Sequence, residues 1–161
     1  MKRGTKDLIR SIGQILLARR MKLAVAESCT GGLLGARITS VAGSSAWFTG
    51  GVIAYANDVK QKLLGVPRAL LERHGAVSKA AAIAMAKGVR RLVRADFAVA
   101  VTGIAGPSGG TRAKPVGTVW IAVGGPVGYK SLRSRFRGGR DRVRRAAVDA
   151  ALRMLVACLT S

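Results

Sequence analysis

Two short, uninterrupted runs of apolar residues constrain the fold of this chain most strongly. They are Leu23–Ala26 (LAVA) and the run from Phe97 to Thr102 (FAVAVT). Continuous apolar runs of this length are typical of strands that are buried on both faces, as in a parallel sheet. Residues 5–20 carry apolar side chains at helical spacing, and so does the alanine-rich segment after Ser78. This alternation of strands and helices predicts an α/β fold layered around a mixed sheet.

Turn and cap residues predict the other elements. Helices are expected over 30–40, 57–64, 68–73, 78–94 and 141–159, and strands over 48–56, 116–123 and 130–137, the last at an edge. Thr30, Asn57 and Ser78 are the expected helix caps. The buried stripe of the last helix is expected to contain Val143, Ala147, Ala150, Met154 and Cys158. Gly50-Gly51 suggests a bulge or a close backbone approach.

Length and composition favour one domain over 1–161, of 161 residues. Aromatic residues make up only 4% of the chain, so Ala, Val, Leu and Ile must build the core. We expect no membrane span, because no apolar run reaches 18 residues, and no signal peptide, because basic residues interrupt the first twenty. Cys29 and Cys158 form no metal or disulfide pattern. A cytoplasmic protein is expected.

The net charge of +21, from 28 basic and 7 acidic residues, favours anionic partners. Phosphorylated small molecules, nucleic acid and membrane surfaces are the candidate classes. Residues 129–145 hold eight basic residues and the single acid Asp141. This segment could bind nucleic acid without catalysis, or it could be an ordinary solvated face. The chain has no helix-turn-helix, zinc-finger or aromatic RNA-binding motif.

Residues 26–32 (AESCTGG) are the best candidate for covalent chemistry. Ser28, Cys29 and Thr30 follow a strand directly and precede a glycine pair. A Ser-His-Asp triad would depend on His74, which is the only histidine and precedes Gly75 in an expected helix-ending turn. The seven acids show no spacing suited to a metal site or a glycosidase pair.

A desolvated lysine can activate a serine without histidine, because burial lowers the pKa of the amine. Lys60 and Tyr55 lie on or before the helix that follows the next strand, so neighbouring strand ends could bring them to Ser28. The backbone N–H groups of Thr30, Gly31 and Gly32 would then face an anion or oxyanion. The alternative is an ordinary capped turn with Lys60 on a solvated helix face.

A glycine-rich loop at 103–110 follows Thr102 at the end of a predicted strand. Thr102 and Gly103 could begin a phosphate or sugar site, although the loop matches neither the Walker nor the Rossmann spacing. A plain flexible loop explains the same residues.

Six motifs in order resemble those of the CinA C-terminal domain family. They are AESCTGG at 26–32, AGSSAWF at 42–48, YANDVK at 55–60, HGAVS at 74–78, GIAGP at 103–107 and KPVGTVW at 114–120. The similarity extends from about Leu8 to Leu159. It implies a three-layer α/β/α sandwich and self-association, and it does not include the partner domain of long CinA proteins.

The resemblance also implies an activity and a site. Family members include enzymes that hydrolyse nicotinamide mononucleotide to nicotinic acid mononucleotide and ammonia, in pyridine nucleotide salvage, without a metal or cofactor. Ser28, Tyr55 and Lys60 match the family's catalytic positions, with Lys60 or Tyr55 as the base, and Ser45 matches a serine near the pocket. Arg140 and Arg144, one helical turn apart, are expected near the substrate phosphate. Ser108 and Gly139 stand where the family usually has Asp, so both remove a negative charge near the expected ligand.

Overall fold

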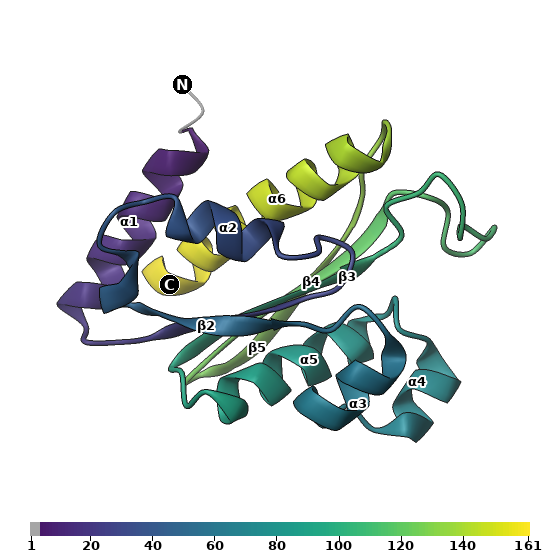
Figure 1. Ribbon diagram of the computed structural model, residues 1–161, viewed down its shortest axis with the longest axis horizontal. Coiled ribbons are helices and arrows are strands. Elements are labelled where there is room, and N and C mark those ends of the chain that lie inside the picture. Colours follow the sequence, from purple (N-terminus) through teal and green to yellow (C-terminus); the bar gives the residue numbers. More distant parts are fainter. Residues whose placement is uncertain (1–3) are drawn as a thin grey trace.

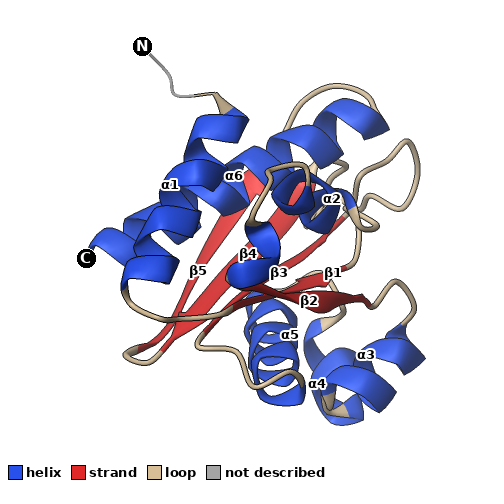
Figure 2. Ribbon diagram, turned by 60° about the vertical axis from the view of Figure 1, so that its left-hand side comes forward, coloured by secondary structure: helices blue, strands red, loops and turns tan. Residues whose placement is uncertain are grey.

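A five-stranded sheet lies between two layers of helices in the computed structural model, which describes residues 4–161 (Figures 1 and 2). The strands are β1 (Leu23–Glu27), β2 (Phe48–Ile53), β3 (Phe97–Gly103), β4 (Thr118–Gly125) and β5 (Gly128–Arg135). The helices are α1 (Thr5–Ala18), α2 (Leu33–Thr39), α3 (Asn57–Leu64), α4 (Arg68–His74), α5 (Lys79–Leu92) and α6 (Arg140–Thr160), with a short 3-10 helix, η1 (Ser44–Ala46).

The strand order is β2-β1-β3-β4-β5. The pairs of β1 with β2 and β3 are parallel, whereas β4 pairs antiparallel with both β3 and β5. Helices α1, α2 and α6 cover one face, and α3, α4 and α5 cover the other (Figure 1). The predicted three-layer α/β/α fold, its mixed sheet and the edge position of β5 are therefore confirmed.

The two faces of the central strands carry side chains of different size. Leu23 and Val25 of β1 pack in the core beneath α1 and α6, while Ala24 and Ala26 pack toward α5. The same alternation continues in β3, because successive side chains of a strand point to opposite faces. Small side chains let α5 lie close to the sheet, which explains how a core forms with so few aromatic rings.

Three local features differ from the sequence-based expectations. Gly32, in the left-handed conformation, is the N-cap of α2 in place of Thr30, and Ala56 precedes α3 in place of Asn57. The buried face of α6 is broader than the predicted stripe and consists of Val143, Ala147, Val148, Ala151, Leu152, Leu155 and Leu159. The predicted Ala150, Met154 and Cys158 are only partly buried, because α6 packs against both α1 and the sheet.

Other local predictions are confirmed. The Ser78 side chain caps α5 by accepting the Ala81 N–H at 3.1 Å. The register of β1 against β2 shifts next to Gly50, as expected for a bulge. A Cβ atom at Gly51 would collide with the Val25 carbonyl, so this close approach requires glycine. None of the helices within residues 4–161 combines the length and apolar character needed to span a bilayer.

Candidate active site

The carboxyl ends of the parallel strands β1, β2 and β3 lie at the same end of the sheet. The residues singled out from the sequence lie there. Ser28 directly follows β1, and its N–H donates to Val101 O of β3 at 2.9 Å. Tyr55 follows β2, and Lys60 lies on α3 immediately beyond it. A cavity of about 290 Å³ opens here, lined by all three residues and by the loop after β3. Open α/β sheets commonly bind ligands at such an end.

Lys60 is the most unusual side chain of the site, because only 1% of it is exposed. Its Nζ lies 3.2 Å from Ser28 Oγ, 2.8 Å from Ala54 O and 3.0 Å from Tyr55 O. Removal from water disfavours the ammonium form, so burial lowers the pKa of Lys60 below its usual value. Lys60 is therefore not on a solvated helix face.

The partners of Lys60 Nζ suit a proton acceptor. A neutral amine keeps two N–H bonds and one lone pair. With the two N–H bonds directed at Ala54 O and Tyr55 O, the lone pair is left for the Ser28 hydroxyl proton. A base must lie within hydrogen-bond reach of the proton that it removes, and the distance from Nζ to Oγ meets that requirement.

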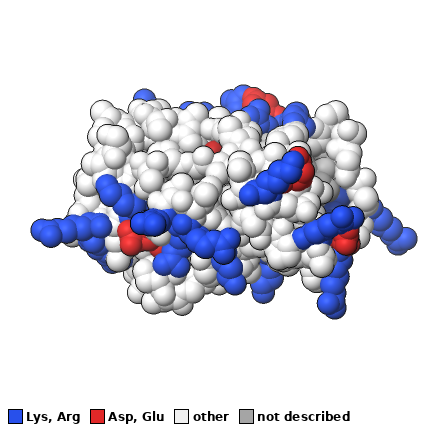
Figure 3. Space-filling view, turned by 60° about the horizontal axis from the view of Figure 1, so that its bottom comes forward, with Lys and Arg blue, Asp and Glu red and all other residues white. Residues whose placement is uncertain are grey.

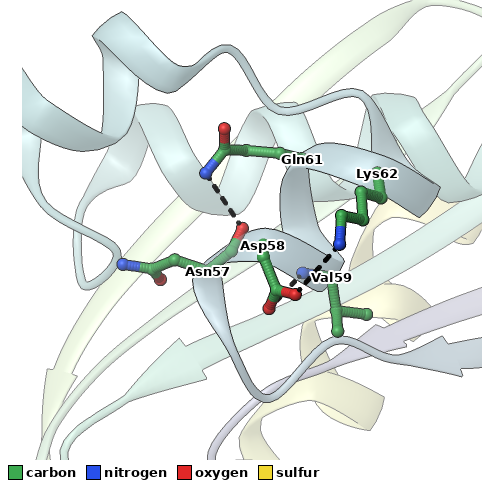
Figure 4. Close-up of polar contacts among 5 residues, drawn as sticks. All are labelled: Asn57, Asp58, Val59, Gln61 and Lys62. Atoms are coloured by element: carbon green, nitrogen blue, oxygen red, sulfur yellow. Dashed lines mark hydrogen bonds and ion pairs between the residues drawn. The ribbon is translucent and has the colours of Figure 1, made fainter.

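The solvent-exposed side of α3 has polar contacts of its own, which Figure 4 shows. Asp58 accepts the Val59 N–H at 2.9 Å, and Lys62 Nζ lies 3.5 Å from the Asp58 carboxylate. Gln61 Nε2 donates to Asn57 O at 3.4 Å. These contacts stabilise the first turns of α3 on its exposed side. Lys60 and Leu64 are buried on the opposite side of the helix.

The backbone turn after Ser28 differs from the predicted oxyanion site. The Gly31 N–H donates to Ser28 O at 3.1 Å, and the Gly32 N–H donates to the Glu27 carboxylate at 3.0 Å. The prediction that Gly31 and Gly32 face an oxyanion is therefore wrong in this structure, because both donors already have partners. Within residues 4–161, the N–H groups of Cys29 and Thr30 form no hydrogen bond to another residue's backbone and are the remaining candidates.

Glu27 is the site residue that the sequence reasoning missed. Its buried carboxylate accepts the N–H groups of Gly32, Leu34 and Gly35 at 3.0, 3.0 and 2.8 Å. These are donors at the start of α2, which Thr30 was expected to cap. The hydroxyl of Thr30 is instead buried and unpartnered among the described residues. An acid placed directly before a strand-to-helix turn is the signal that could have identified this cap.

Cys29 packs into the core beneath α6, although it directly follows Ser28. Burial raises the pKa of its thiol to about 11. The thiol is therefore protonated at neutral pH, and a protonated thiol is a poor nucleophile. Both Cys29 and Ser28 line the cavity, so the protonated state of the thiol, and not its position, leaves Ser28 as the nucleophile candidate of the turn.

Tyr55 and Arg140 meet at the mouth of the cavity. Tyr55 is 58% exposed, and its hydroxyl accepts a hydrogen bond of 2.8 Å from Arg140 Nη2. Arg140 Nη1 donates to Gly106 O at 2.8 Å, so this side chain joins α6 to the glycine-rich loop. Between the two bases left open by the sequence, the geometry favours Lys60, because it contacts Ser28 Oγ directly whereas the phenol contacts Arg140.

The glycine-rich loop forms one wall of the cavity. Thr102 and Gly103 line it as predicted, but the Thr102 hydroxyl donates to Ala76 O at 2.8 Å and holds the segment before α5. A Cβ atom at Gly103 would lie 2.8 Å from Thr118 O, so this strand end needs glycine. Ser108 also lines the cavity.

Three other residues considered from the sequence lie outside this cavity. Arg144 is close by and donates to Thr30 O at 2.8 Å, so it supports the turn without lining the cavity. Ser45 is exposed in η1, before β2 begins, whereas the cavity lies where β2 ends. Because β2 has six residues, its ends are separated by roughly 17 Å. The placement of Ser45 near the pocket is therefore wrong. His74 ends α4, also outside the cavity.

The charges around the cavity favour an anionic ligand. Lys60 and Arg140 line it, and no acidic residue within the described part of the chain does. The Glu27 carboxylate is turned toward the start of α2, where it accepts three backbone N–H groups. Together, these features define an α/β protein with a buried Ser-Lys pair beside an arginine, an arrangement that can support nucleophilic chemistry.

The chain belongs to the family described as the CinA C-terminal domain, whose model matches residues 5–159. It is 55% identical over 140 residues to a CinA-like protein of Anaeromyxobacter dehalogenans, which covers 87% of this chain and 34% of the relative. It is 56% identical over 144 residues to a CinA-like protein of a Synechococcus strain, covering 88% of this chain and 34% of the relative. The chain thus spans about a third of the length of these curated relatives.

Solved structures agree with the fold. The competence/damage inducible protein CihA from Agrobacterium tumefaciens is 42% identical, with a TM-score of 0.94 over 100% of this chain and 99% of that one. A CinA superfamily protein from Klebsiella pneumoniae is 36% identical, with a TM-score of 0.93 over 98% of this chain and 99% of that one. The predicted family is therefore confirmed.

Proposed function

We propose that this protein is an amidohydrolase that converts nicotinamide mononucleotide to nicotinic acid mononucleotide and ammonia. The observation that carries the proposal is the buried Lys60 amine, 3.2 Å from Ser28 Oγ at the edge of an electropositive cavity. Desolvation lowers the pKa of Lys60 and raises the fraction of neutral amine available as a base.

In the proposed reaction, Lys60 Nζ takes the proton of the Ser28 hydroxyl as Oγ attacks the carboxamide carbon. The N–H groups of Cys29 and Thr30 stabilise the resulting oxyanion. The Lys60 ammonium returns its proton to the departing nitrogen, and ammonia leaves an acyl-serine. Lys60 then takes a proton from water as the water oxygen attacks the acyl carbon. The Lys60 ammonium returns this proton to Ser28 Oγ as the bond from Oγ to the acyl carbon breaks, which releases the acid and restores both groups.

The substrate phosphate is assigned to Arg140 in this proposal. Arg140 lies at the cavity mouth, and a guanidinium can form two parallel hydrogen bonds to phosphate oxygens. Its present partners, Gly106 O and the Tyr55 hydroxyl, are neutral. We therefore propose that Tyr55 positions Arg140 and lines the cavity, and that it does not transfer a proton.

The test is ammonia release from nicotinamide mononucleotide by the wild-type protein and by Ser28→Ala. We expect turnover by the wild type and a loss of at least about a thousandfold in the variant, because the nucleophile is removed. Ser45→Ala, at the opposite end of the sheet, serves as the matched control and should retain turnover. Near-normal turnover by Ser28→Ala would refute the role of Ser28. Absence of turnover in the wild type, with hydrolysis of another amide, would refute the substrate.

A further inference from the structure

Two further cavities lie on the face of the sheet that carries α3, α4 and α5. The first, of about 430 Å³, is lined mainly by apolar and small residues: Leu64, Gly65, Pro67, Leu70, Ala80, Ile83, Ala84 and Gly88. The second, of about 280 Å³, is lined by Arg90, Arg94, Ala95 and Tyr129. Lys87 and Arg91 line both cavities, so the two adjoin along α5 and are together called the α5 groove. This groove shares no lining residue with the candidate active site.

The cationic end of the groove has an unusual density of uncompensated charge. Lys87, Arg90 and Arg91 lie in the last two turns of α5, and Arg94 follows in the turn after the helix. None of them forms an ion pair within residues 4–161. Figure 3 shows this side of the molecule, where basic side chains clearly outnumber acidic ones.

Helix energetics account for only part of this cluster. Arg90 and Arg91 lie in the last turn of α5, where the helix dipole favours cations. Like charges three or four residues apart on a helix repel each other, so Arg90 and Arg91 both oppose Lys87. An external anion bound here would remove that repulsion.

Contacts of the cations also prearrange this end of the groove. Lys87 Nζ lies 5.4 Å above the centre of the Tyr129 ring, and Arg90 Nη1 lies 3.5 Å from the Tyr129 hydroxyl. A Cβ atom at Gly65 would lie 2.8 Å from Arg91 Nη2, so this guanidinium reaches across to the end of α3. Arg91 therefore marks the boundary between the apolar and the cationic parts.

The apolar end exists because α3 and α5 approach closely at a glycine. A Cβ atom at Gly88 would collide with the Leu64 carbonyl, so the two backbones touch there. Beside this contact, Ile83, Ala84 and Leu70 remain only partly buried and line a space of small-molecule size. The groove thus places an apolar cavity directly next to a cluster of cations.

From this juxtaposition we infer that the α5 groove binds an organic diphosphate, with its apolar or planar body between α3, α4 and α5 and its phosphates on Lys87, Arg90, Arg91 and Arg94. The body distinguishes this ligand from a simple polyanion, because the cations alone would bind inorganic phosphates equally well. The inference does not depend on the proposed amidase activity, and its test involves no turnover.

The experiment measures binding of ADP, geranyl diphosphate and inorganic pyrophosphate by isothermal titration calorimetry. ADP offers a planar body and geranyl diphosphate an aliphatic one, whereas pyrophosphate has neither. We expect at least one of the two organic diphosphates to bind at least tenfold more tightly than pyrophosphate. If neither does, the inference is overturned.

Variants locate the site. Lys87→Ala with Arg91→Ala should weaken binding at least tenfold, and Ala84→Phe, which fills the apolar end without changing charge, should do the same. Arg37→Ala with Arg153→Ala removes two exposed charges on the opposite face of the sheet and should change the affinity less than twofold. Arg140→Ala should also leave binding unchanged; if it abolishes binding, the ligand occupies the candidate active site and the inference fails. Thermal unfolding of each variant confirms that it is folded.

Binding of a ten-residue oligo(dT) strand tests whether the groove is a specific site or only part of a general basic surface. Steeply salt-dependent binding of the strand, unaffected by Ala84→Phe and tighter than that of either organic diphosphate, would overturn the inference in favour of an electrostatic nucleic-acid face.

Discussion

The Glu27 carboxylate accepts the Gly35 N–H at 2.8 Å, eight residues further along the chain. The same carboxylate also accepts two other N–H groups at the start of α2, so it holds the turn that presents Ser28. A buried charged acceptor with three backbone donors contributes to both the stability and the shape of the turn.

Replacing Glu27 with Gln should therefore destabilise the protein. An amide has one oxygen, and its NH₂ group would face donors, which leaves at least one buried N–H without a partner. We expect the free energy of unfolding to fall by about 2 kcal/mol, typical for a hydrogen bond to a charged group. Urea denaturation measures this change. Asp7→Asn in α1, an exposed acid, is the control, and an equal effect of both variants would contradict this role for Glu27.

The pH dependence of stability tests the burial of Lys60. Because the folded pKa of Lys60 is lowered, the unfolded chain binds the proton more readily between the folded pKa and about 10.4. Stability rises with pH wherever the unfolded state binds more protons. The unfolding free energy of the wild type relative to Lys60→Met should therefore increase with pH up to about 10.4, by at most about 1.4 kcal/mol per pH unit. A flat difference would show that Lys60 is not desolvated in solution.

The same shift predicts the pH profile of the proposed reaction. A neutral Lys60 is the active form, so kcat/KM should rise with pH through one deprotonation below the usual lysine pKa of about 10.4. Lys60→Arg keeps a positive charge but cannot act as a base, and should lose at least about a hundredfold in kcat. An unchanged profile and rate in Lys60→Arg would assign the base to another group.

Arg140 should act on binding more than on chemistry. Arg140→Ala is expected to raise KM for nicotinamide mononucleotide at least about tenfold, because a charged contact to phosphate is lost. The effect on nicotinamide riboside, which lacks the phosphate, should be several-fold smaller. Steady-state kinetics with both substrates provides the comparison, and Arg142→Ala, an exposed neighbour, is the control. Equal losses for both substrates would contradict the phosphate assignment.

Cys29 should be inert despite its position beside Ser28. With the pKa of its thiol raised to about 11, Cys29 should react with iodoacetamide at pH 7.5 more slowly than the half-buried Cys158. Mass spectrometry of the alkylated native protein measures both sites. Cys29→Ala should keep turnover within about fivefold, whereas inactivation that follows the alkylation of Cys29 would point to a catalytic thiol.

Local sequence patterns were sufficient for much of the fold. The apolar runs became β1 and β3, the Ser78 cap began α5 and the Gly50-Gly51 pair marked a bulge, because each depends on residues close in sequence. Those patterns also identified Ser28 as a side chain at a strand-to-helix turn. The match of Ser28, Tyr55 and Lys60 to catalytic positions came from the family resemblance, and their roles stay predictions.

Contacts between distant segments decided the rest. The Glu27 carboxylate of β1 accepts the α2 donors that Thr30 was expected to cap. The parallel pairing of β1 and β2 puts Ser45, which precedes β2, at the opposite end of the sheet from Ser28, which follows β1. No local pattern distinguishes a buried lysine from an exposed one on a short helix. The sequence by itself determined which elements form and which side chain stands at the turn. Only the tertiary structure decided that Lys60 is desolvated against Ser28, because burial and pKa depend on groups brought together from separate strands.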